Sequence, residues 1–289
     1  EQAGKLTYGS TLYTTLEPCC YQSRTPPCTK AIVDAGITDV RIATLDPNNR
    51  VNGRGKSELQ GAGLQVSVGE SEKCARELME SYLHWATTGR PMIIAKYAMS
   101  LDGKVATVGG ESRWITDEDS RLRVHCLRRN CDAVGVGIGT VLQDDPKLTA
   151  RDINGKPLDS QPLRVIIDSG GRLPSNAQLL REPGSTLIAV AEITPQRELE
   201  LCEQGVEILT VPGADNRVDL RALIRFLGTR EVTSILIEGG GTLLASLLEA
   251  GLVDKIIAFV APILIGGKSA PSPVSGNGIV HLTDALNLS

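Results

Sequence analysis

The sequence lacks an excess of basic charge. Its 30 Lys and Arg residues stand against 34 Asp and Glu, a net charge of −4, whereas a nucleic-acid-binding surface needs a clustered basic excess. It lacks an apolar run able to cross a bilayer, since the run 256–265 is short and is interrupted by Pro262. It shows no charged-then-apolar leader, and its seven scattered cysteines do not form a secreted disulfide framework. We expect a cytoplasmic protein that binds neither nucleic acid nor membrane.

Histidine is scarce as well: the chain has three, and none is followed two residues later by Glu. The first half nevertheless carries Pro18-Cys19 after the strand-like run 11–14, and Cys28 opens an apparent helix. A proline-flanked Cys ahead of a second Cys is typical of a zinc deaminase site, which takes two thiolates and one His, leaves a position for water, and needs a Glu to carry the proton. Cys19 and Cys28 are therefore candidate zinc ligands of an incomplete site, cut by where the sequence begins. Cys20 is an awkward third ligand because it adjoins Cys19.

Length and pattern predict two domains. A chain of 289 residues can bury a large core, and Gly89-Arg90-Pro91 carries a helix-ending signal. We therefore place one domain at 1–88 and the other at 91–289. In the first domain the pattern predicts strands at 11–16, 39–44 and 64–68, and helices at 28–35, 57–61 and 70–87. In the second it predicts strands at 92–98, 132–137, 163–168, 185–191, 206–210, 233–238 and 255–261, and helices at 117–130, 195–204, 218–228 and 242–250. Short apolar strands alternating with amphipathic helices predict an open, largely parallel α/β sheet.

The start of the second domain contains a turn and two possible ligand contacts. Asp102-Gly103 is a turn signal, which on its shape alone favours a hairpin. Ser112 and Trp114 precede the helix predicted at 117–130, where a polar side chain and a flat aromatic ring could face a ligand. A Trp in a globular chain is more often part of the core.

Arginines flank the apolar, glycine-rich strand 133–137. Ligands of α/β sheets gather at the carboxyl ends of strands. Arg128 and Arg151 are therefore candidates for a substrate phosphate, which a guanidinium group binds with two parallel hydrogen bonds. A lone Arg on a helix is usually solvated, and the two acids before Pro146 would ordinarily make only a solvated turn.

Another strand end combines a carboxylate with glycines. The apolar run 234–237 ends in Glu238, followed by Gly239-Gly240-Gly241 and Thr242. Glycines let a backbone approach closely, and amides at a helix start hold phosphate. Such turns are also common without ligands, and the pattern is not the Gly-x-Gly-x-x-Gly fingerprint, so a Rossmann fold is not indicated. At a third strand end, Asp168-Ser169 could touch a cofactor or cap the turn.

Together these segments resemble the bifunctional riboflavin biosynthesis deaminase/reductase family over essentially the whole chain. The deaminase half is matched by Thr15-Leu16-Glu17-Pro18-Cys19, Arg24-Thr25-Pro26-Pro27-Cys28, Asp46-Pro47-Asn48 and Gly53-x-Gly55. The reductase half is matched by Ser100-Leu101-Asp102-Gly103, Glu111-Ser112-x-Trp114-Ile115-Thr116, residues 140–151 and Glu238-Gly239-Gly240. Each motif is weak alone, but their order and spacing are highly specific.

The resemblance implies a partial cytidine-deaminase-like α/β domain followed by a dihydrofolate-reductase-like α/β domain whose last strand is missing. It implies NADPH-dependent reduction of 5-amino-6-(5-phosphoribosylamino)uracil to the ribitylamino product, joined to zinc-dependent deamination of the preceding intermediate, in a homo-oligomer. The implied cofactor contacts are Ala98, Trp114, Thr140, Asp144, Ser169, Gly240, Gly241, Thr242, Leu243, Leu244, Ala245 and Ser246. The implied substrate contacts are Ser112, Arg128, Leu148, Arg151 and Glu238. Glu238 and Lys96 are the implied catalytic residues, with Lys96 polarising the opened sugar.

The sequence departs from the family pattern in the first half, and two alternatives stay open. The His-x-Glu pair is absent, and residues 20–23 lack the His common after the Cys pair, so we expect a fragment open at both ends whose deaminase site is incomplete. In one alternative the chain is a monofunctional reductase, and Cys19 and Cys28 belong to a structural or assembly module. In the other it reduces a pterin-like substrate, which the fold alone would allow and which the phosphate-suited Arg128 and Arg151 disfavour.

Overall fold

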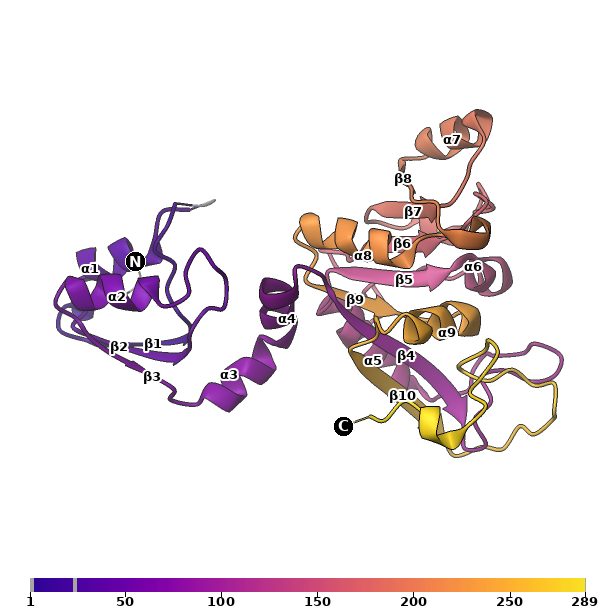
Figure 1. The fold of residues 1–289 in the computed structure, drawn as a ribbon, viewed down its shortest axis with the longest axis horizontal. Helices are drawn as coiled ribbons and strands as arrows, with labels where there is room; N and C mark the ends of the chain where they lie inside the picture. Colours follow the sequence, from indigo (N-terminus) through magenta and orange to yellow (C-terminus); the bar gives the residue numbers. More distant parts are fainter. Residues whose placement is uncertain (1–2, 23–24, 289) are drawn as a thin grey trace. The chain divides into compact units, whose positions relative to one another are not determined.

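The computed structural model describes residues 3–22 and 25–288, and the chain divides into two compact units, Glu1–Gly89 and Arg90–Ser289. Each unit is a parallel sheet with helices packed against it (Figure 1). In the part of the chain that the structure describes, no helix combines the length and the apolarity needed to span a bilayer.

The first unit is built on a sheet of three parallel strands in the order β1-β2-β3. The strands are β1 (Thr11–Leu16), β2 (Asp39–Thr44) and β3 (Gln65–Val68), and the helices are η1 (Gly4–Thr7), α1 (Cys28–Asp34), α2 (Arg54–Gly61), α3 (Glu72–Leu78) and α4 (Glu80–Thr88). Val40 and Ile42 lie two residues apart on β2 and so share one face, where they pack against Ile32 of α1 and Leu59 of α2. All three predicted strands are confirmed.

Two helix predictions in this unit are wrong in their bounds. The helix predicted over 70–87 is two helices, α3 and α4, which separate at Met79, where φ is −108° and ψ is 20°. The sequence contains neither Gly nor Pro at that point, so it carries no signal for the break. The helix predicted at 57–61 begins three residues earlier, at Arg54, directly after Gly53 with its positive φ of 84°.

The second unit is built on seven parallel strands in the order β10-β4-β9-β5-β6-β7-β8. The strands are β4 (Met92–Ser100), β5 (Ala133–Gly137), β6 (Leu163–Ile167), β7 (Thr186–Val190), β8 (Val206–Thr210), β9 (Ser234–Ile237) and β10 (Lys255–Ala261). The helices are α5 (Glu118–Arg129), α6 (Ile138–Asp144), η2 (Gln178–Arg181), α7 (Pro195–Cys202), η3 (Ala214–Asn216), α8 (Leu220–Thr229), α9 (Gly241–Glu249) and η4 (Leu282–Asp284). The predicted parallel α/β sheet and its seven strands are confirmed.

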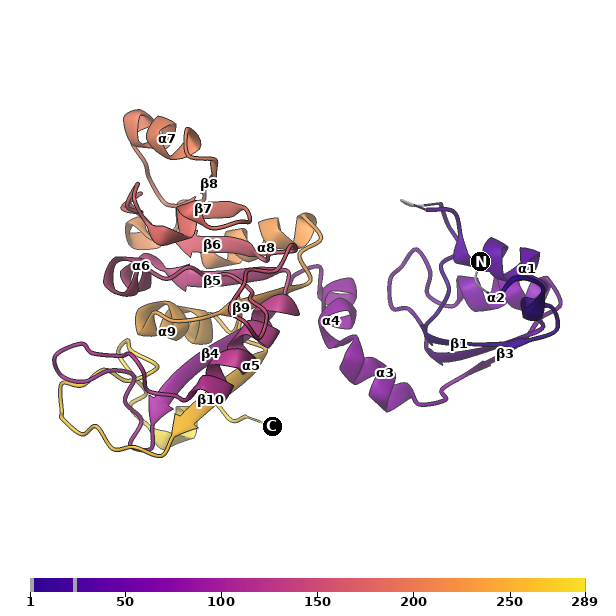
Figure 2. The same cartoon turned by 180° about the vertical axis from the view of Figure 1, so that it is seen from behind.

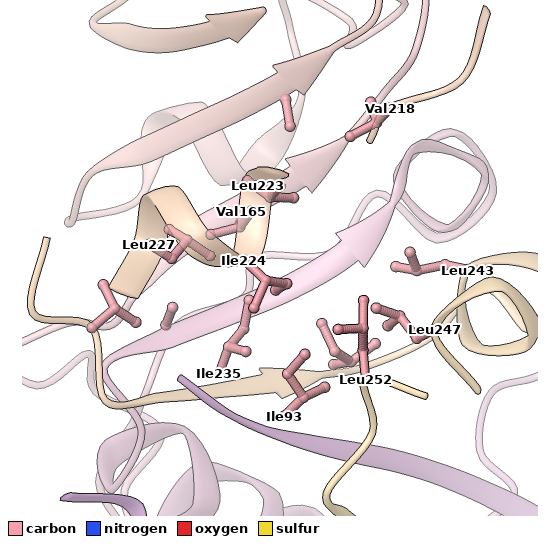
Figure 3. Close-up of a cluster of buried hydrophobic side chains, with 14 of the residues drawn as sticks. Ile93, Val165, Val218, Leu223, Ile224, Leu227, Ile235, Leu243, Leu247 and Leu252 are labelled. Atoms are coloured by element: carbon pink, nitrogen blue, oxygen red, sulfur yellow. The ribbon is translucent and has the colours of Figure 1, made fainter. Parts of the chain in front are cut away.

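Strand register divides the apolar residues of the second unit between two faces. Ile93 is paired with Ile235, and both belong to the cluster that α8 and α9 cover with residues such as Leu223 and Leu247 (Figure 3). The neighbouring residue on β4 points to the opposite face, as the two-residue period of a strand requires. That face packs against α5, α6 and α7, and α5 lies in front of the sheet in Figure 2.

The hairpin favoured at Asp102-Gly103 is wrong. The Ser100 amide donates to the Lys104 carbonyl at 2.8 Å, so a turn is present, but residues 101–117, all of which the structure describes, contain no strand. The Asp102 carboxylate instead accepts the backbone amides of Ile265 and Gly266 at 3.0 and 2.7 Å. The turn therefore joins the segment after β4 to the segment after β10.

Candidate active site

A cavity of about 670 Å³ lies at the carboxyl ends of β4, β9, β5 and β6. The helix after β9 covers one face of the sheet, whereas the helices after β4 and β5 cover the other. Ligands of open α/β sheets bind in the crevice where the chain connections diverge in this way. The cavity is lined by the strand-end residues Lys96, Gly137, Ile167 and Glu238, and by Ser275 from the segment after β10.

A buried cluster of three charges lies at one end of this cavity. Glu238, which follows β9 directly, has a side chain only 6% exposed. Arg128 of α5 binds it with two hydrogen bonds, from Nε to Oε1 at 2.5 Å and from Nη2 to Oε2 at 3.0 Å. The Lys96 Nζ on β4 lies 3.9 Å from Oε2. Because both Lys96 and Glu238 line the cavity and Arg128 does not, a ligand meets a carboxylate that is already paired and an ammonium group beside it.

The cluster perturbs the acid–base properties of its members. Burial lowers the pKa of Lys96; Glu238 opposes that change, and Arg128 adds to it. Burial alone would raise the pKa of Glu238, but the charge of Arg128, its hydrogen bonds and Lys96 outweigh burial, so the pKa lies below its ordinary value. Glu238 therefore stays ionised, and Lys96 gives up its proton more readily than an exposed lysine.

The glycine turn between β9 and α9 forms the middle of the cavity. Gly239 and Gly240 have φ of 119° and 86°, the left-handed region that favours glycine. Gly241 is constrained differently: an added Cβ would lie 2.5 Å from the Ser275 Oγ and 3.3 Å from the Pro273 carbonyl oxygen. Gly241 therefore packs tightly against the segment after β10. This packing explains why the residue is small, so its small size is not evidence for a bound phosphate.

Most of the residues predicted to contact cofactor or substrate line this one cavity. They are Lys96, Ala98, Ser112, Thr140, Asp144, Ser169, Glu238, Gly240, Gly241, Thr242, Leu243, Leu244 and Ser246. Two of them touch each other, since the Ser112 hydroxyl donates to the Asp144 carboxylate at 3.4 Å. The structure therefore brings together residues that lie up to 150 positions apart in the chain.

Five predicted contacts lie outside the cavity lining. Trp114 is 70% exposed, and its ring stacks with the Arg121 guanidinium at 4.7 Å. Leu148 is 3% exposed and belongs to the hydrophobic core, and Ala245 is buried on α9. Arg128 is hydrogen-bonded to Glu238, so its guanidinium group is not open to a phosphate.

Arg151, the fifth, belongs to a separate group of charges. Its Nη2 donates to Glu182 at 2.9 Å, its Nε to the Thr149 hydroxyl at 2.9 Å and its Nη1 to the Gly155 carbonyl at 2.8 Å. The Lys147 Nζ lies 3.1 Å from the same Glu182 carboxylate. Three of the five N–H groups of Arg151 are thus in use.

Sequence reasoning missed several residues that line the cavity. Gly139 of α6, Arg172 after β6, Arg217 after β8, and Ser275 all line it. Position was a usable signal for Arg172, which follows the strand end at Asp168-Ser169 by three residues. Arg217 and Ser275 had no such signal, because they come from irregular segments that only the folded chain brings to this edge.

The two predicted zinc ligands face each other in the first unit. The Cys19 and Cys28 Sγ atoms are 3.2 Å apart, and the Cys28 amide donates to the Cys19 Sγ. Cys20 points elsewhere, towards the Arg50 carbonyl at 3.9 Å, and Arg24 of the same motif lies outside the described residues. Within residues 3–22 and 25–288, no group of three or more His, Cys, Asp and Glu side chains is placed to hold a metal ion. The described residues thus supply two thiols and not a complete zinc site.

A buried carboxylate fixes the backbone beside this thiol pair. Glu17, 3% exposed, accepts the amides of Asp46 at 3.2 Å, Gly53 at 2.9 Å and Lys56 at 2.9 Å. Gly55 packs so closely against the chain before Cys19 that an added Cβ would lie 2.1 Å from the Pro18 carbonyl oxygen. The 46–56 loop is therefore held directly against the cysteine loop.

The parallel sheet with a glycine turn and a buried charge cluster at its carboxyl edge defines the second unit as an α/β enzyme domain with a small-molecule site. The model of the RibD C-terminal domain matches residues 91–288. The riboflavin biosynthesis protein RibD of Actinobacillus pleuropneumoniae is 40% identical over 97% of this chain and 74% of its own length. This chain belongs to the RibD family of riboflavin biosynthesis proteins.

Solved structures of the family share the architecture. Acinetobacter baumannii RibD superposes with a TM-score of 0.88 at 36% identity, covering 99% of this chain and 78% of that one. A diaminohydroxyphosphoribosylaminopyrimidine deaminase/5-amino-6-(5-phosphoribosylamino)uracil reductase of Thermotoga maritima superposes with a TM-score of 0.81 at 32% identity, covering 96% and 74%. The second unit is thus a dihydrofolate-reductase-like reductase domain that takes a nicotinamide cofactor, and it follows an α/β domain built on a parallel sheet.

Proposed function

We propose that residues 91–289 reduce 5-amino-6-(5-phosphoribosylamino)uracil to the ribitylamino product with NADPH, and that residues 1–88 are the C-terminal part of a zinc deaminase domain for the preceding intermediate. The observation that carries the proposal is the position of Lys96 beside Glu238, inside the cavity that also contains the glycine turn. The Thermotoga maritima relative, whose printed name gives both activities, supports it.

The cavity suits a dinucleotide in shape and in lining. Apolar and backbone surface comes from Ala98, Leu243 and the glycine turn, and hydroxyl groups come from Thr140, Ser169 and Ser246. When bound, the nicotinamide would supply the hydride, and the protein would supply orientation. We take the nicotinamide to lie at the Lys96 end of the cavity. The sugar of the substrate then lies there too, because a reacting carbon must lie within about 3–3.5 Å of the hydride donor for efficient transfer.

Lys96 is the proposed proton donor. The ribosylamine exposes a reducible carbon only when its sugar ring opens: the nitrogen lone pair forms a C=N bond, and the ring oxygen leaves and takes up a proton. The Lys96 ammonium can give that proton, and its lowered pKa makes the transfer easier. Hydride addition to the resulting iminium carbon then gives the ribitylamine, and Lys96 recovers a proton from solvent. One hydride and one proton are consumed in each turnover.

Glu238 and Arg128 are proposed to set the charge of Lys96 rather than to bind the substrate directly. Both Glu238 oxygens accept hydrogen bonds from Arg128, so the carboxylate offers little unpaired charge to a ligand. It still lies 3.9 Å from the Lys96 Nζ and raises the pKa of Lys96. Glu238 therefore opposes the loss of the Lys96 proton that burial favours, and Arg128 keeps Glu238 ionised.

Arg151 is the proposed ligand of the substrate phosphate, although it lies outside the cavity lining. Two of its five N–H groups have no partner among the described residues, and Lys147 on the same Glu182 carboxylate adds a second cation. A phosphate at this group would anchor one end of the substrate while the sugar reaches the Lys96 end.

For the deaminase half, the thiol pair is the basis of a proposed zinc site. Cys19 and Cys28 suit two of the three protein ligands that a catalytic zinc takes. The described residues provide no third ligand, so no chemical step follows for this unit.

Replacing Lys96 by Met tests the reductase proposal. The variant keeps the length and apolar stem of the side chain and removes its proton, so kcat should fall roughly 10²- to 10⁴-fold. Steady-state oxidation of NADPH with the deaminated ribosylaminouracil phosphate measures the rate, and titration of NADPH onto the variant should give the parent affinity. If the parent chain does not reduce this substrate and instead oxidises NADPH with a dihydropterin, the proposal is overturned in favour of the pterin alternative.

A further inference from the structure

The cavity contains two arginines for which the proposed reduction has no use. Both line it: Arg172 follows Ser169 at the carboxyl end of β6, and Arg217 follows β8, which lies two strands beyond β6 in the sheet. The Arg172 side chain is 62% exposed, and its one recorded partner is the Asp168 carboxylate, 3.5 Å from Nε. In the described part of the chain, the terminal nitrogens of Arg172 and the whole Arg217 guanidinium lack a hydrogen-bond partner. One guanidinium group paired only through its Nε and one without a hydrogen-bond partner among the described residues thus line the same cavity, and together they form a site for an anion.

These arginines lie at the opposite end of the cavity from Lys96. The sheet order from β4 through β9 and β5 to β6 spans three strand spacings, or roughly 14 Å at about 4.8 Å each. The glycine turn after β9 lies between the two ends. A dinucleotide whose nicotinamide is at Lys96 and whose pyrophosphate is at the glycine turn therefore has its adenosine at the end of β6.

Asp168, the acid at this strand end, is not positioned to bind the adenosine ribose as an NADH-specific site requires. Enzymes that use NADH commonly accept the adenosine 2′-hydroxyl with a carboxylate, whereas those that use NADPH place an Arg near the 2′-phosphate. Asp168 is fully buried, accepts the Leu173 amide at 2.8 Å, and is absent from the cavity lining. What faces the cavity here is Ser169, Arg172 and Arg217.

The loop that carries Arg217 is held firmly. Gly213 donates to the Arg217 carbonyl at 2.7 Å, and the Arg217 amide donates to Ala214 at 3.0 Å. Asp215 and Asn216, just before it, have φ of 53° and 54°, a left-handed conformation that costs free energy in residues other than glycine. The strained turn ends at Arg217, which lines the cavity.

We infer that Arg172 and Arg217 bind the 2′-phosphate of the cofactor and set the preference for NADPH over NADH. The inference rests on the proposed function, because it takes the cavity to be the dinucleotide site. The two guanidinium groups supply charge-assisted hydrogen bonds to the phosphate, and neither meets a group that NADH carries.

The test is a binding comparison in the full chain. Adenosine 2′,5′-bisphosphate and AMP, titrated by calorimetry, differ only in the 2′-phosphate. Arg172→Ala and Arg217→Ala should each weaken the bisphosphate roughly tenfold or more and leave AMP unchanged; the ratio of NADPH to NADH affinity should fall in parallel. Arg181→Ala, an arginine outside the cavity, is the matched control and should change neither ligand.

Three outcomes would overturn the inference in distinguishable ways. If the variants leave the bisphosphate-to-AMP ratio at the parent value, the 2′-phosphate lies elsewhere, while the reductase proposal stands. If they raise KM for the ribosylaminouracil phosphate and not Kd for NADPH, the arginines serve the substrate. If the folded parent binds neither dinucleotide, the proposed function fails together with the inference.

Discussion

The position of Lys96 beside Glu238 is part of a group of three charges that share one buried region. A lysine 16% exposed would lose its proton easily, and the carboxylate 3.9 Å away counteracts that tendency. Arg128 in turn keeps Glu238 ionised through two hydrogen bonds. The proton that we propose Lys96 to donate therefore depends on a residue that the substrate need not touch.

Glu238→Gln should shift the pH profile of the reductase. The neutral amide removes the attraction that raises the pKa of Lys96, so the pKa falls further below its ordinary value of 10.5. Because the protonated form is the donor, kcat/KM is lost as pH rises through that pKa, and the alkaline limb should move to lower pH. Profiles of kcat/KM for the parent and the variant give the measurement, with Glu249→Gln on α9 as the control. An alkaline limb that does not move would show that Glu238 is only structural.

At the residue scale the sequence predicted which side chains meet, but not how they pair. Resemblance placed Lys96, Glu238 and the glycine turn in one site, and the cavity contains all of them. The position of Arg128 near a strand end made it a candidate for a phosphate, whereas the structure pairs Arg128 with Glu238. That pairing joins α5 to the end of β9, 110 positions apart, and no local pattern records which of several cations reaches a given carboxylate.

At the scale of elements, single carboxylates attach loops to one another. Glu17 accepts three amides of the 46–56 loop, and Asp102 accepts two amides of the segment after β10. The strands were predictable because a short run of apolar residues indicates a buried strand. The conformations of these loops were not predictable, because each depends on a carboxylate whose partners lie dozens of residues away in the sequence. The break between α3 and α4 at Met79 was missed for a similar reason.

Glu17→Ala should destabilise the first unit. Three buried amides would lose a charged acceptor, and each such hydrogen bond contributes roughly 1.5–3 kcal/mol, so we expect a loss of about 3 kcal/mol or more. Urea unfolding followed by circular dichroism measures it, and Glu70→Ala, at an exposed position of the same unit, is the control. Equal unfolding midpoints for the two variants would contradict the role of Glu17.

The Asp102 contact predicts an acid limit for the segment after β10. The Ser100 hydroxyl and the amides of Ile265 and Gly266 lower the pKa of Asp102 from 3.8 to about 2. A carboxyl group whose pKa is lowered on folding stabilises the fold above its unfolded pKa, and that contribution is lost as pH falls through the folded value. The protection of the amides of 263–267, relative to their intrinsic exchange rates at each pH, should therefore fall between about pH 4 and pH 2, and Asp102→Asn should show low protection at every pH. Equal protection in Asp102→Asn at pH 6 would count against it.

At the scale of the whole molecule, the two units differ in how complete their chemistry is. The second unit gathers a cavity, a charge cluster and a glycine turn. The first brings two thiols to 3.2 Å and, among the residues described, offers them no third metal ligand. The parallel sheets of both units followed from the alternation of strands and helices along the sequence, and the approach of Cys19 to Cys28 followed from the proline-flanked cysteine pattern.

The chain should bind zinc weakly and should not deaminate. Two thiolates leave half of a tetrahedral site to solvent, so metal analysis after gel filtration should give well under one zinc per chain. Cys19→Ser should remove what remains, while Cys74→Ser, at an exposed cysteine outside the pair, should not. NADPH oxidation by the second unit should be the same in all three proteins. One tightly held zinc per chain with deaminase turnover would contradict this prediction.

The strand order of the second unit also has a consequence for its synthesis. The first strand made, β4, is paired on its two sides by the last two made, β9 and β10. Ribosomes add about 5–20 residues per second, so the stretch between Ser100 and Ser234 takes roughly 7 to 27 s to translate. Throughout that time the apolar strand Met92-Ile93-Ile94-Ala95 has neither neighbour, and both its edges remain open to other nascent chains. The same arrangement that places Lys96 beside Glu238 thus leaves both edges of β4 unpaired until nearly all of the sheet has been made.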